Sequence, residues 1–326
     1  MDTQKTNSEA PKIRVVFMGT PAFAQSILAS LIDRRYNIVA AYTRPDKAIG
    51  RKQEIQESPV KQLAGKHAIP VEQPERFDEE TLRKLKEYKP DMIVVVAYGK
   101  ILPLSVLKIP GFGCINIHPS LLPKFRGPSP IQNALISGEE TTGTTIMLMD
   151  EGVDSGDIIA QKVVAIDADE RYPELAETLA NESAALLLET LPAWIERRIT
   201  SQSQDASQAT LCQLIEREDG HILWNTDAVT IYNAYRALYP WPGMYSIWHR
   251  EDGQRLRIKL IRIACQKQSP QTTHRLGEVF ELGEKIGVQT SSGVILLEEV
   301  HLEGKTVAPI KEFVKGYPQF IGSVLQ

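Results

Sequence analysis

Residues 113–123 read Gly-Cys-Ile-Asn-Ile-His-Pro-Ser-Leu-Leu-Pro. They contain a short apolar run, Cys114–Ile117, and an earlier apolar run lies at Ile93–Ala97, so we expect two buried strands of one sheet. Asn116 and His118 are two residues apart, which places both side chains on the same face of an extended strand. An amide and an imidazole on one face can both donate hydrogen bonds to a single oxygen of a reacting carbonyl group. The stretch therefore predicts a polar site on a parallel sheet.

The residues before this stretch alternate between strand-like and helix-like segments. Short apolar runs predict buried strands at Ile13–Met18, Asn37–Thr43 and Met92–Ala97. Apolar stripes or helix-start signals predict helices at Pro21–Arg34, from Ser58, at Asp78–Tyr88 and at Pro128–Ser137. This order predicts an α/β domain with a doubly wound, mainly parallel sheet of the Rossmann-like type. Gly19-Thr20-Pro21 stands where a dinucleotide binder has Gly-x-Gly-x-x-Gly, so the sequence does not predict an NAD site.

A loop rich in glycine and aspartate lies between two further predicted strands, Thr144–Met149 and Asp157–Ile166. Its residues are Asp150-Glu151-Gly152-Val153-Asp154-Ser155-Gly156, and loops of this kind at the end of a sheet often carry function. The longest helical pattern follows at Pro173–Arg198, and we expect Pro192 to kink or break that helix.

The composition changes after residue 199, because Thr200–Thr210 is rich in Ser, Gln and Asp and has no apolar anchor. We therefore expect a linker at 200–212. Beyond it, alternating segments predict strands at Tyr245–His249, Leu256–Ile263, Gly277–Leu282, Ile286–Thr290 and Val294–Val300. Five short strands over ~100 residues favour a small OB-like β-barrel, followed by a helix at Ile310–Lys315. The predicted domains are 12–199 and 213–326, after a disordered tail at 1–11.

Bulk composition limits the classes of protein to consider. The chain has 326 residues, of which 42% are hydrophobic and 24% charged, and this fits a two-domain globular enzyme. A net charge of -4 argues against broad non-specific nucleic-acid binding but leaves room for one localised basic surface. The three cysteines have no paired spacing, which predicts neither disulfides nor a zinc site and fits the cytoplasm. No apolar run approaches the ~20 residues of a membrane helix, so we expect no membrane partner. We also expect a monomer.

Asn116-x-His118, the following Ser-Leu-Leu-Pro and the later Asp154 together resemble the folate-dependent formyltransferases. The resemblance implies transfer of a formyl group from 10-formyltetrahydrofolate, the co-substrate, to an amine, without a metal. Asn116 and His118 would stabilise the oxyanion of the tetrahedral intermediate, while Asp154 would support His118 and help to relay the amine proton. Asp150 and Asp157 are competing carboxylates, for which a loop cap and a turn are the expected roles.

The same resemblance implies a folate site in two further segments. Ser120, Leu121, Leu122 and Pro123 would border the folate. Lys100, Ile101 and Leu102 would hold the pterin through their backbone groups. Core packing is the alternative for Ile101 and Leu102, and both interpretations can hold because backbone atoms can bind while side chains pack.

Three features favour tRNA as the carrier of the acceptor amine. The basic loop Thr43–Lys52 resembles a family loop that enters the tRNA acceptor arm. This resemblance implies that Arg51 and Lys52 bind tRNA. The alternative is a charged loop that is simply solvated. The C-terminal domain resembles the family's tRNA-binding barrel. Strict alternation in residues 255–260 places three cations on one strand face, where they either contact tRNA phosphates or form an ordinary solvent face. These cations are Arg255, Arg257 and Lys259.

The resulting hypothesis is formyl transfer to the α-amino group of methionine on initiator tRNA. The main rival is a sugar-nucleotide amine formyltransferase with the same folate donor, which the loop at 43–52 and the tail Gly304–Gly322 disfavour. Glycinamide ribonucleotide formyltransferases share the motif but end near the first domain, which would leave residues 213–326 unexplained. A non-catalytic tRNA-binding protein is disfavoured by the intact Asn116, His118 and Asp154.

Overall fold

The computed structural model describes residues 13–49, 54–250, 252–268 and 274–326, so the expected tail at 1–11 lies outside the described residues. The chain divides into two compact units. The first contains Met1–Pro130, Thr141–Ala165 and Ala176–Gln213, and the second contains Ile131–Glu140, Ile166–Leu175 and Leu214–Gln326. The domain boundaries expected at 199 and 213 stay a prediction.

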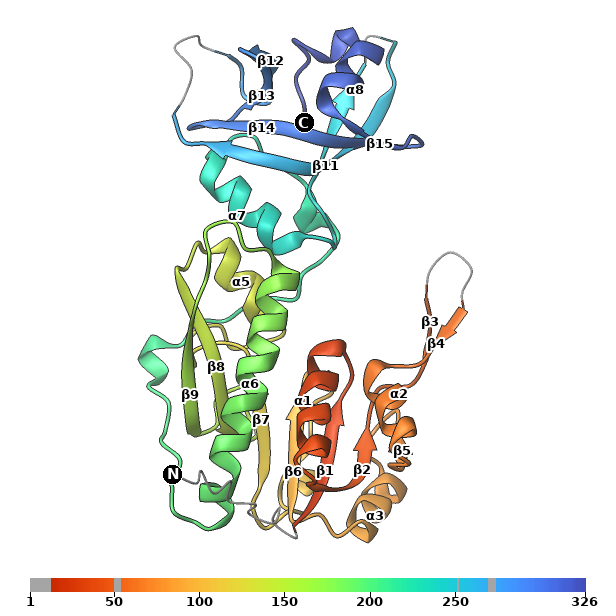
Figure 1. The fold of residues 1–326 in the computed structure, drawn as a ribbon, viewed down its shortest axis with the longest axis vertical. Coiled ribbons are helices and arrows are strands. Elements are labelled where there is room, and N and C mark those ends of the chain that lie inside the picture. Colours follow the sequence, from red (N-terminus) through yellow and green to blue (C-terminus); the bar gives the residue numbers. More distant parts are fainter. Residues whose placement is uncertain (1–12, 50–53, 251, 269–273) are drawn as a thin grey trace, which may run out of the picture. The chain divides into compact units, whose positions relative to one another are not determined.

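The first unit is built on a seven-stranded sheet with the strand order β5-β2-β1-β6-β7-β8-β9 (Figure 1). Its strands are β1 (Arg14–Gly19), β2 (Asn37–Tyr42), β5 (Val71–Glu72), β6 (Met92–Val96), β7 (Cys114–His118), β8 (Thr141–Leu148) and β9 (Ile158–Ala165). The strands from β5 to β7 pair in parallel, whereas β8 and β9 add an antiparallel edge. The prediction of a mainly parallel, doubly wound sheet is confirmed.

Six helices interleave with these strands: α1 (Ala22–Asp33), α2 (Pro59–Lys66), α3 (Glu79–Glu87), α4 (Leu104–Leu107), α5 (Pro130–Ile136) and α6 (Tyr172–Ile195). Side-chain caps begin two of them, since Ser58 Oγ accepts from the Lys61 N–H at 3.1 Å and Asp78 Oδ1 accepts from the Thr81 N–H at 3.0 Å. The longest helix, α6, continues through Pro192 to its end, so the proline does not break it. Among the described residues, none of the helices has both the length and the apolar character needed to span a bilayer.

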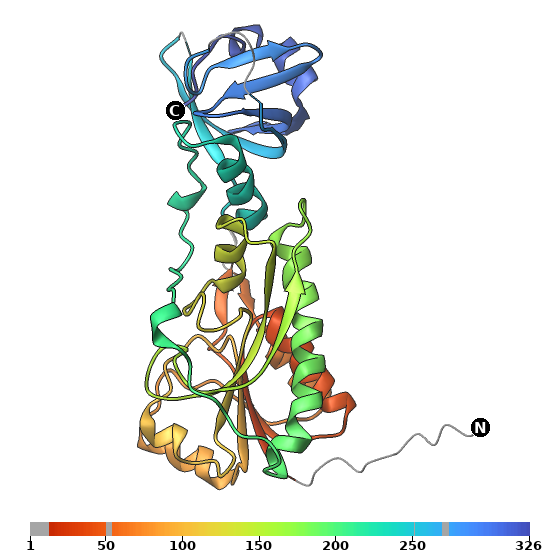
Figure 2. The same cartoon turned by 90° about the vertical axis from the view of Figure 1, so that its left-hand side faces the viewer.

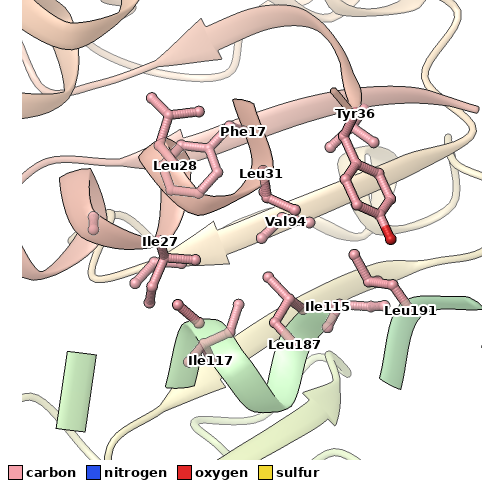
Figure 3. Close-up of a cluster of buried hydrophobic side chains, with 14 of the residues drawn as sticks. Phe17, Ile27, Leu28, Leu31, Tyr36, Val94, Ile115, Ile117, Leu187 and Leu191 are labelled. Carbon is pink, nitrogen blue, oxygen red and sulfur yellow. The ribbon is translucent and has the colours of Figure 1, made fainter. Parts of the chain in front are cut away.

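The two faces of this sheet carry separate hydrophobic cores. On one face, Ile115 and Ile117 of β7 join a cluster with apolar residues of α1 and α6 (Figure 3). On the other face, Cys114 joins a second cluster with residues of α3 and α4. Burial of each large apolar side chain stabilises the fold by about 1.5–3 kcal/mol. Because side chains alternate along a strand, this packing leaves Asn116 and His118 on the same face as Cys114.

The second unit contains a six-stranded antiparallel sheet in the order β10-β11-β14-β13-β12, with β15 paired to β14. Its elements are α7 (Ala228–Leu238), β10 (Tyr245–His249), β11 (Arg255–Gln266), β12 (Val279–Leu282), β13 (Lys285–Gln289), β14 (Val294–Leu302), β15 (Val307–Pro309) and α8 (Ile310–Gly316). All five predicted strands are present, and β15 was not expected because it has only three residues and ends in proline.

The chain end joins the two open edges of this second sheet. The Leu325 N–H bonds the Gly277 carbonyl at 2.8 Å beside β12, and the Gln326 N–H bonds the Ile247 carbonyl of β10 at 2.9 Å. The sheet therefore closes on itself, and its curved strands are visible in blue in Figure 2. This closure confirms the prediction of a small C-terminal barrel.

Candidate functional site

The polar pair on β7 lies on one face of the strand, as its spacing predicted. Ile115 and Ile117 point into the core beside α1 and α6, so Asn116 and His118 point to the opposite face. Both polar residues are buried, with only 9% of Asn116 and 4% of His118 exposed. Buried polar side chains require hydrogen-bond partners, and these come from the loop that follows β7 and from the acidic loop around Asp154.

Asp154 is the common partner in this cluster. Its Oδ1 accepts a hydrogen bond from Asn116 Nδ2 at 3.2 Å, and its Oδ2 accepts one from the Gly127 N–H at 2.9 Å. The same Oδ2 lies 3.6 Å from His118 Nδ1, which is ion-pair distance when the ring is charged. The structure thus brings together the three predicted catalytic residues, Asn116, His118 and Asp154.

The imidazole of His118 faces oxygen atoms on both sides. Its Nε2 lies 2.8 Å from the Phe125 carbonyl oxygen. A carbonyl can only accept a hydrogen bond, so Nε2 carries a proton. Nδ1 faces the Asp154 carboxylate, and a second proton on that nitrogen would satisfy both contacts. Both ring nitrogens therefore face oxygen atoms, and these contacts fix the orientation of the ring.

The amide of Asn116 has one hydrogen left for a substrate. Its NH₂ group carries two hydrogens, and Asp154 accepts one of them. Within the described part of the chain, the structure gives this amide no other hydrogen bond. The second N–H can therefore donate to an oxygen that enters the site. Asp154 is the most accessible member, with 17% of its side chain exposed against 5% for His118.

Two backbone features hold the acidic loop in place. Asp154 has φ +49°, in the left-handed region that aspartate tolerates better than most residues. Gly127 has φ +120°, and a Cβ on it would lie 2.5 Å from the Cys212 carbonyl oxygen, so only glycine lets its N–H reach Asp154. The competing carboxylates have other partners: Ser155 Oγ donates to Asp150, and Ser201 Oγ donates to Asp157.

The loop at Ser120–Pro123 is fixed by polar side chains of β8 and β9. Thr145 Oγ1 donates to the Ser120 carbonyl at 2.6 Å, and Gln161 Nε2 donates to the Leu122 carbonyl at 2.8 Å. Ser120 is fully buried, and its Oγ donates to the Lys124 carbonyl, so its side chain holds the loop's shape. The assignment of Ser120, Leu121, Leu122 and Pro123 to the folate site stays a prediction.

The second predicted folate segment follows β6, the neighbour of β7 in the sheet. Lys100 Nζ donates to the carbonyls of Pro74 and Glu75, and its burial lowers the pKa of this ammonium from the usual value. Leu102 is 5% exposed, which fits the core-packing alternative. Ile101 is 87% exposed, which does not fit core packing and leaves an apolar side chain open to a ligand.

The predicted tRNA loop, Thr43–Lys52, contains β3 (Lys47–Ile49), which pairs antiparallel with β4 (Glu54–Gln56) just after the loop. Arg51 and Lys52 lie outside the described residues. The base of the pair is anchored by Asp46, whose carboxylate lies 2.5 Å from Lys61 Nζ. This hydrogen bond lowers the pKa of Asp46 below its ordinary value.

The predicted basic face of β11 has the expected alternation. Ile258 and Leu260 are buried at 0% and 3% exposure, whereas the cations between them are at least partly open to solvent. Pairing with β10 places Arg257 opposite Ile247 and Lys259 opposite Tyr245. Residues opposite each other in antiparallel strands share a face, so this face combines cations with an aromatic ring.

A hollow of about 450 Å³ opens on this face. It is lined by Arg217, Ile247, Arg255, Arg257 and Glu303. The Arg257 guanidinium lies 4.1 Å from the centre of the Tyr245 ring, a cation–π distance. Arg217 was not predicted, because it belongs to a segment before the barrel strands and only the fold brings it to Arg255.

Three groups that build the site were missed by sequence reasoning. The carbonyl of Phe125 and the N–H of Gly127 are backbone groups, and no side-chain pattern identifies them. Gln204 lies in the segment expected to be a linker, yet its amide donates to the Asp154 carbonyl at 2.9 Å. A lone glutamine between polar residues gives no signal of such a contact.

Comparison with known proteins agrees with this geometry. The chain matches the family described as "Formyl transferase" over residues 12–191 and "Formyl transferase, C-terminal domain" over residues 214–318. It is 43% identical over 315 residues to a methionyl-tRNA formyltransferase of Caldicellulosiruptor saccharolyticus, covering 95% of this chain and 99% of the relative.

Solved structures share the fold at lower identity. An N-formyltransferase from Helicobacter canadensis, solved with folinic acid and dTDP-3-aminofucose, has a TM-score of 0.64 at 17% identity and covers 87% of this chain and 98% of its own. HypX from Aquifex aeolicus, in complex with tetrahydrofolic acid, has a TM-score of 0.62 at 17% identity and covers 95% of this chain and 48% of its own. The family matches and the full-length relative show that the chain belongs to the formyl transferase family, in its methionyl-tRNA formyltransferase branch.

Proposed function

We propose that the protein transfers the formyl group of 10-formyltetrahydrofolate to the α-amino group of methionine on initiator tRNA. The observation that carries this proposal is the contact of Asp154 with both Asn116 and His118 on one face of β7. The proposal is also supported by a relative: the chain is 43% identical to a methionyl-tRNA formyltransferase along almost the whole length of both chains. A reaction on charged tRNA belongs in the cytoplasm, the compartment that the cysteine usage predicts.

The three side chains have complementary roles in the proposed reaction. The lone pair of the methionine amine forms a bond to the formyl carbon, and the carbonyl electrons move to the oxygen. The free N–H of Asn116 donates to this oxyanion, and the imidazolium of His118 adds positive charge beside it. The amine passes a proton to the Asp154–His118 pair, which returns a proton to N10 as the bond from carbon to N10 breaks. The products are formyl-methionyl-tRNA and tetrahydrofolate.

We assign the folate to the surface formed by the loops after β6 and β7. These strands are parallel neighbours, so their carboxyl ends meet at the same edge of the sheet, where ligands of open α/β sheets bind. The exposed apolar side chain of Ile101 suits a pterin, and the backbone between Lys100 and Leu102 supplies polar groups. The loop at 120–123, which β8 and β9 hold in place, would form the neighbouring wall of the folate site.

The basic face of β11 provides the test of tRNA binding. Replacing Arg255, Arg257 and Lys259 together by alanine is expected to weaken tRNA binding and to reduce the slope of log K against log salt by about 2–3. The physical reason is that each phosphate contact releases a condensed counterion. Arg262→Ala on the same strand is the control, because Glu298 and Glu299 already pair with that cation at 2.9 and 3.0 Å. A triple variant with the wild-type slope would remove these residues from the interface.

The function itself is tested by offering alternative acceptors. The protein is incubated with 10-formyltetrahydrofolate and either initiator methionyl-tRNA, elongator methionyl-tRNA or a dTDP-linked amino sugar, and formylated products are identified by mass spectrometry. We expect formyl-methionine on the initiator tRNA and no formylated sugar. Formylation of the sugar nucleotide alone, or of no acceptor, would overturn the proposal.

A further inference from the structure

The segment between the two family matches is bound to the first unit. It was expected to be a linker, but Gln202 exchanges two backbone hydrogen bonds with Ile158 of β9, at 2.7 and 2.8 Å. Farther along, the Thr210 carbonyl accepts from the Arg126 N–H at 2.9 Å, and the Thr210 hydroxyl accepts from the Phe125 N–H at 2.8 Å. The segment therefore runs along the loop whose Phe125 carbonyl contacts His118.

Gln204 is the side chain of this segment that bridges two parts of the candidate site. Its Nε2 donates to the Asp154 carbonyl at 2.9 Å and to the Gly156 carbonyl at 2.7 Å. Its Oε1 accepts from Arg126 Nε at 3.0 Å and from Arg126 Nη2 at 2.7 Å. The reverse orientation of the amide would face donors with donors and acceptors with acceptors, so the network fixes its orientation.

Two of the residues that Gln204 contacts, Asp154 and Arg126, lie in the loops that surround His118. Asp154 has a left-handed backbone, and a hydrogen bond to its carbonyl fixes that conformation and hence the direction of its carboxylate. Arg126 stands between Phe125, which contacts His118, and Gly127, which donates to Asp154. One amide thus ties the acidic loop to the loop that supports the imidazole, without being among the side chains that contact His118 or Asn116.

We propose that Gln204 is a positioning residue for formyl transfer, which sets the distance between the Asp154 carboxylate and the His118 ring. The proposal rests on the proposed function, since it assigns Gln204 to the same reaction. A displacement of about 1 Å in a catalytic group can lower a rate by ~10²-fold. Gln204 therefore acts on the chemical step, and substrate binding should not depend on it.

Two substitutions separate the two halves of this bridge. Gln204→Ala removes all contacts of the amide. Gln204→Glu keeps oxygen acceptors for Arg126 but has no hydrogen to donate to the carbonyls of Asp154 and Gly156. Gln208→Ala is the matched control, because this exposed glutamine lies on the same segment and its amide donates to Asp205 and to no other residue that the structure describes.

We expect both Gln204 variants to lower kcat by about 10–100-fold and to leave the KM values for folate and tRNA within about twofold, as for residues that support a catalytic group. The Gln208→Ala variant should match the wild type. Wild-type kcat in Gln204→Glu would overturn the proposal, because the bond to Arg126 alone would then suffice. A rise in KM without a fall in kcat would also overturn it.

Amide hydrogen exchange without substrates separates this proposal from the proposed function. In both Gln204 variants we expect faster exchange in peptides covering residues 123–128 and 150–157. Exchange in the rest of the chain and the melting temperature should stay as in the wild type. Gln208→Ala should exchange like the wild type throughout. Unchanged exchange in those peptides would overturn the role of Gln204. Absence of transferase activity in the wild type would instead overturn the proposed function and, with it, the catalytic part of this proposal. The exchange result would then decide only whether Gln204 holds the two loops together.

Discussion

The His118→Ala variant is expected to lose about 10³-fold in kcat for formylation of initiator methionyl-tRNA, within the range for a general acid–base group. Its ring nitrogens face the Phe125 carbonyl and the Asp154 carboxylate. In the proposed mechanism, alanine would remove the group that stabilises the oxyanion and takes part in the proton relay. The fold should persist, because Ile115 and Ile117 hold β7 in the core from the other face. The measurement is steady-state kcat together with the melting temperature.

His67→Ala serves as the control for the first prediction. This histidine is exposed at the end of α2, far in sequence from β7, and its removal should leave kcat unchanged. A folded His118→Ala variant with kcat within about threefold of the wild type would show that the ring has no part in the chemical step.

The Asp154→Asn variant is expected to lower kcat by about 10²–10³-fold, as for removal of one preorganised electrostatic partner. The carboxylate accepts from Asn116 on one oxygen and from the Gly127 N–H on the other. An asparagine must place its NH₂ group against one of these donors, and it also loses the negative charge beside His118. The fall should appear in kcat more than in KM, because the substrates still bind.

Asp157→Asn is the matched comparison for this second prediction. Asp157 is one of the two competing carboxylates in the same stretch, and it accepts a hydrogen bond from Ser201 Oγ at 3.2 Å. Its replacement should change kcat by less than about threefold. A larger loss in Asp157→Asn than in Asp154→Asn would mean that the wrong carboxylate has been assigned.

Much of the first unit could be predicted from local sequence patterns. The apolar runs of β1, β2 and β6 and the cap at Ser58 are short-range signals, and the structure confirms each of them. The position of Asn116 and His118 on one face of β7 also follows from a local rule, the period of two in a strand. Sequence reasoning succeeded where neighbouring residues decide the structure.

The interpretation of residues 200–212 as a plain linker was incomplete for a physical reason. Apolar periodicity marks segments that are held by burial, whereas Gln204 and Thr210 are held by hydrogen bonds, which leave no such pattern. Phe125 and Gly127 act through backbone groups, which every residue type offers in some form. Contacts of this kind depend on the path of the chain, and a single sequence does not reveal them.

The basic face of β11 could be predicted only in part from the alternation of residues along the strand. Alternation placed Arg255, Arg257 and Lys259 together, and the burial of Ile258 between them agrees. Arg217 joins the same hollow from an irregular segment before the barrel. Its position depends on tertiary structure, which no period in the sequence encodes.

The central claim is that Asn116 and His118, with Asp154, stabilise one tetrahedral intermediate. The most direct test is the single-turnover rate of formyl transfer by the Asn116→Ala/His118→Ala double variant, with both substrates bound before mixing. We predict a rate at least about 10³-fold below that of the wild type. The loss should be no larger than the loss in the slower single variant, because the effects of residues that act as a unit are not additive. A folded double variant that transfers the formyl group at the wild-type rate would contradict the account.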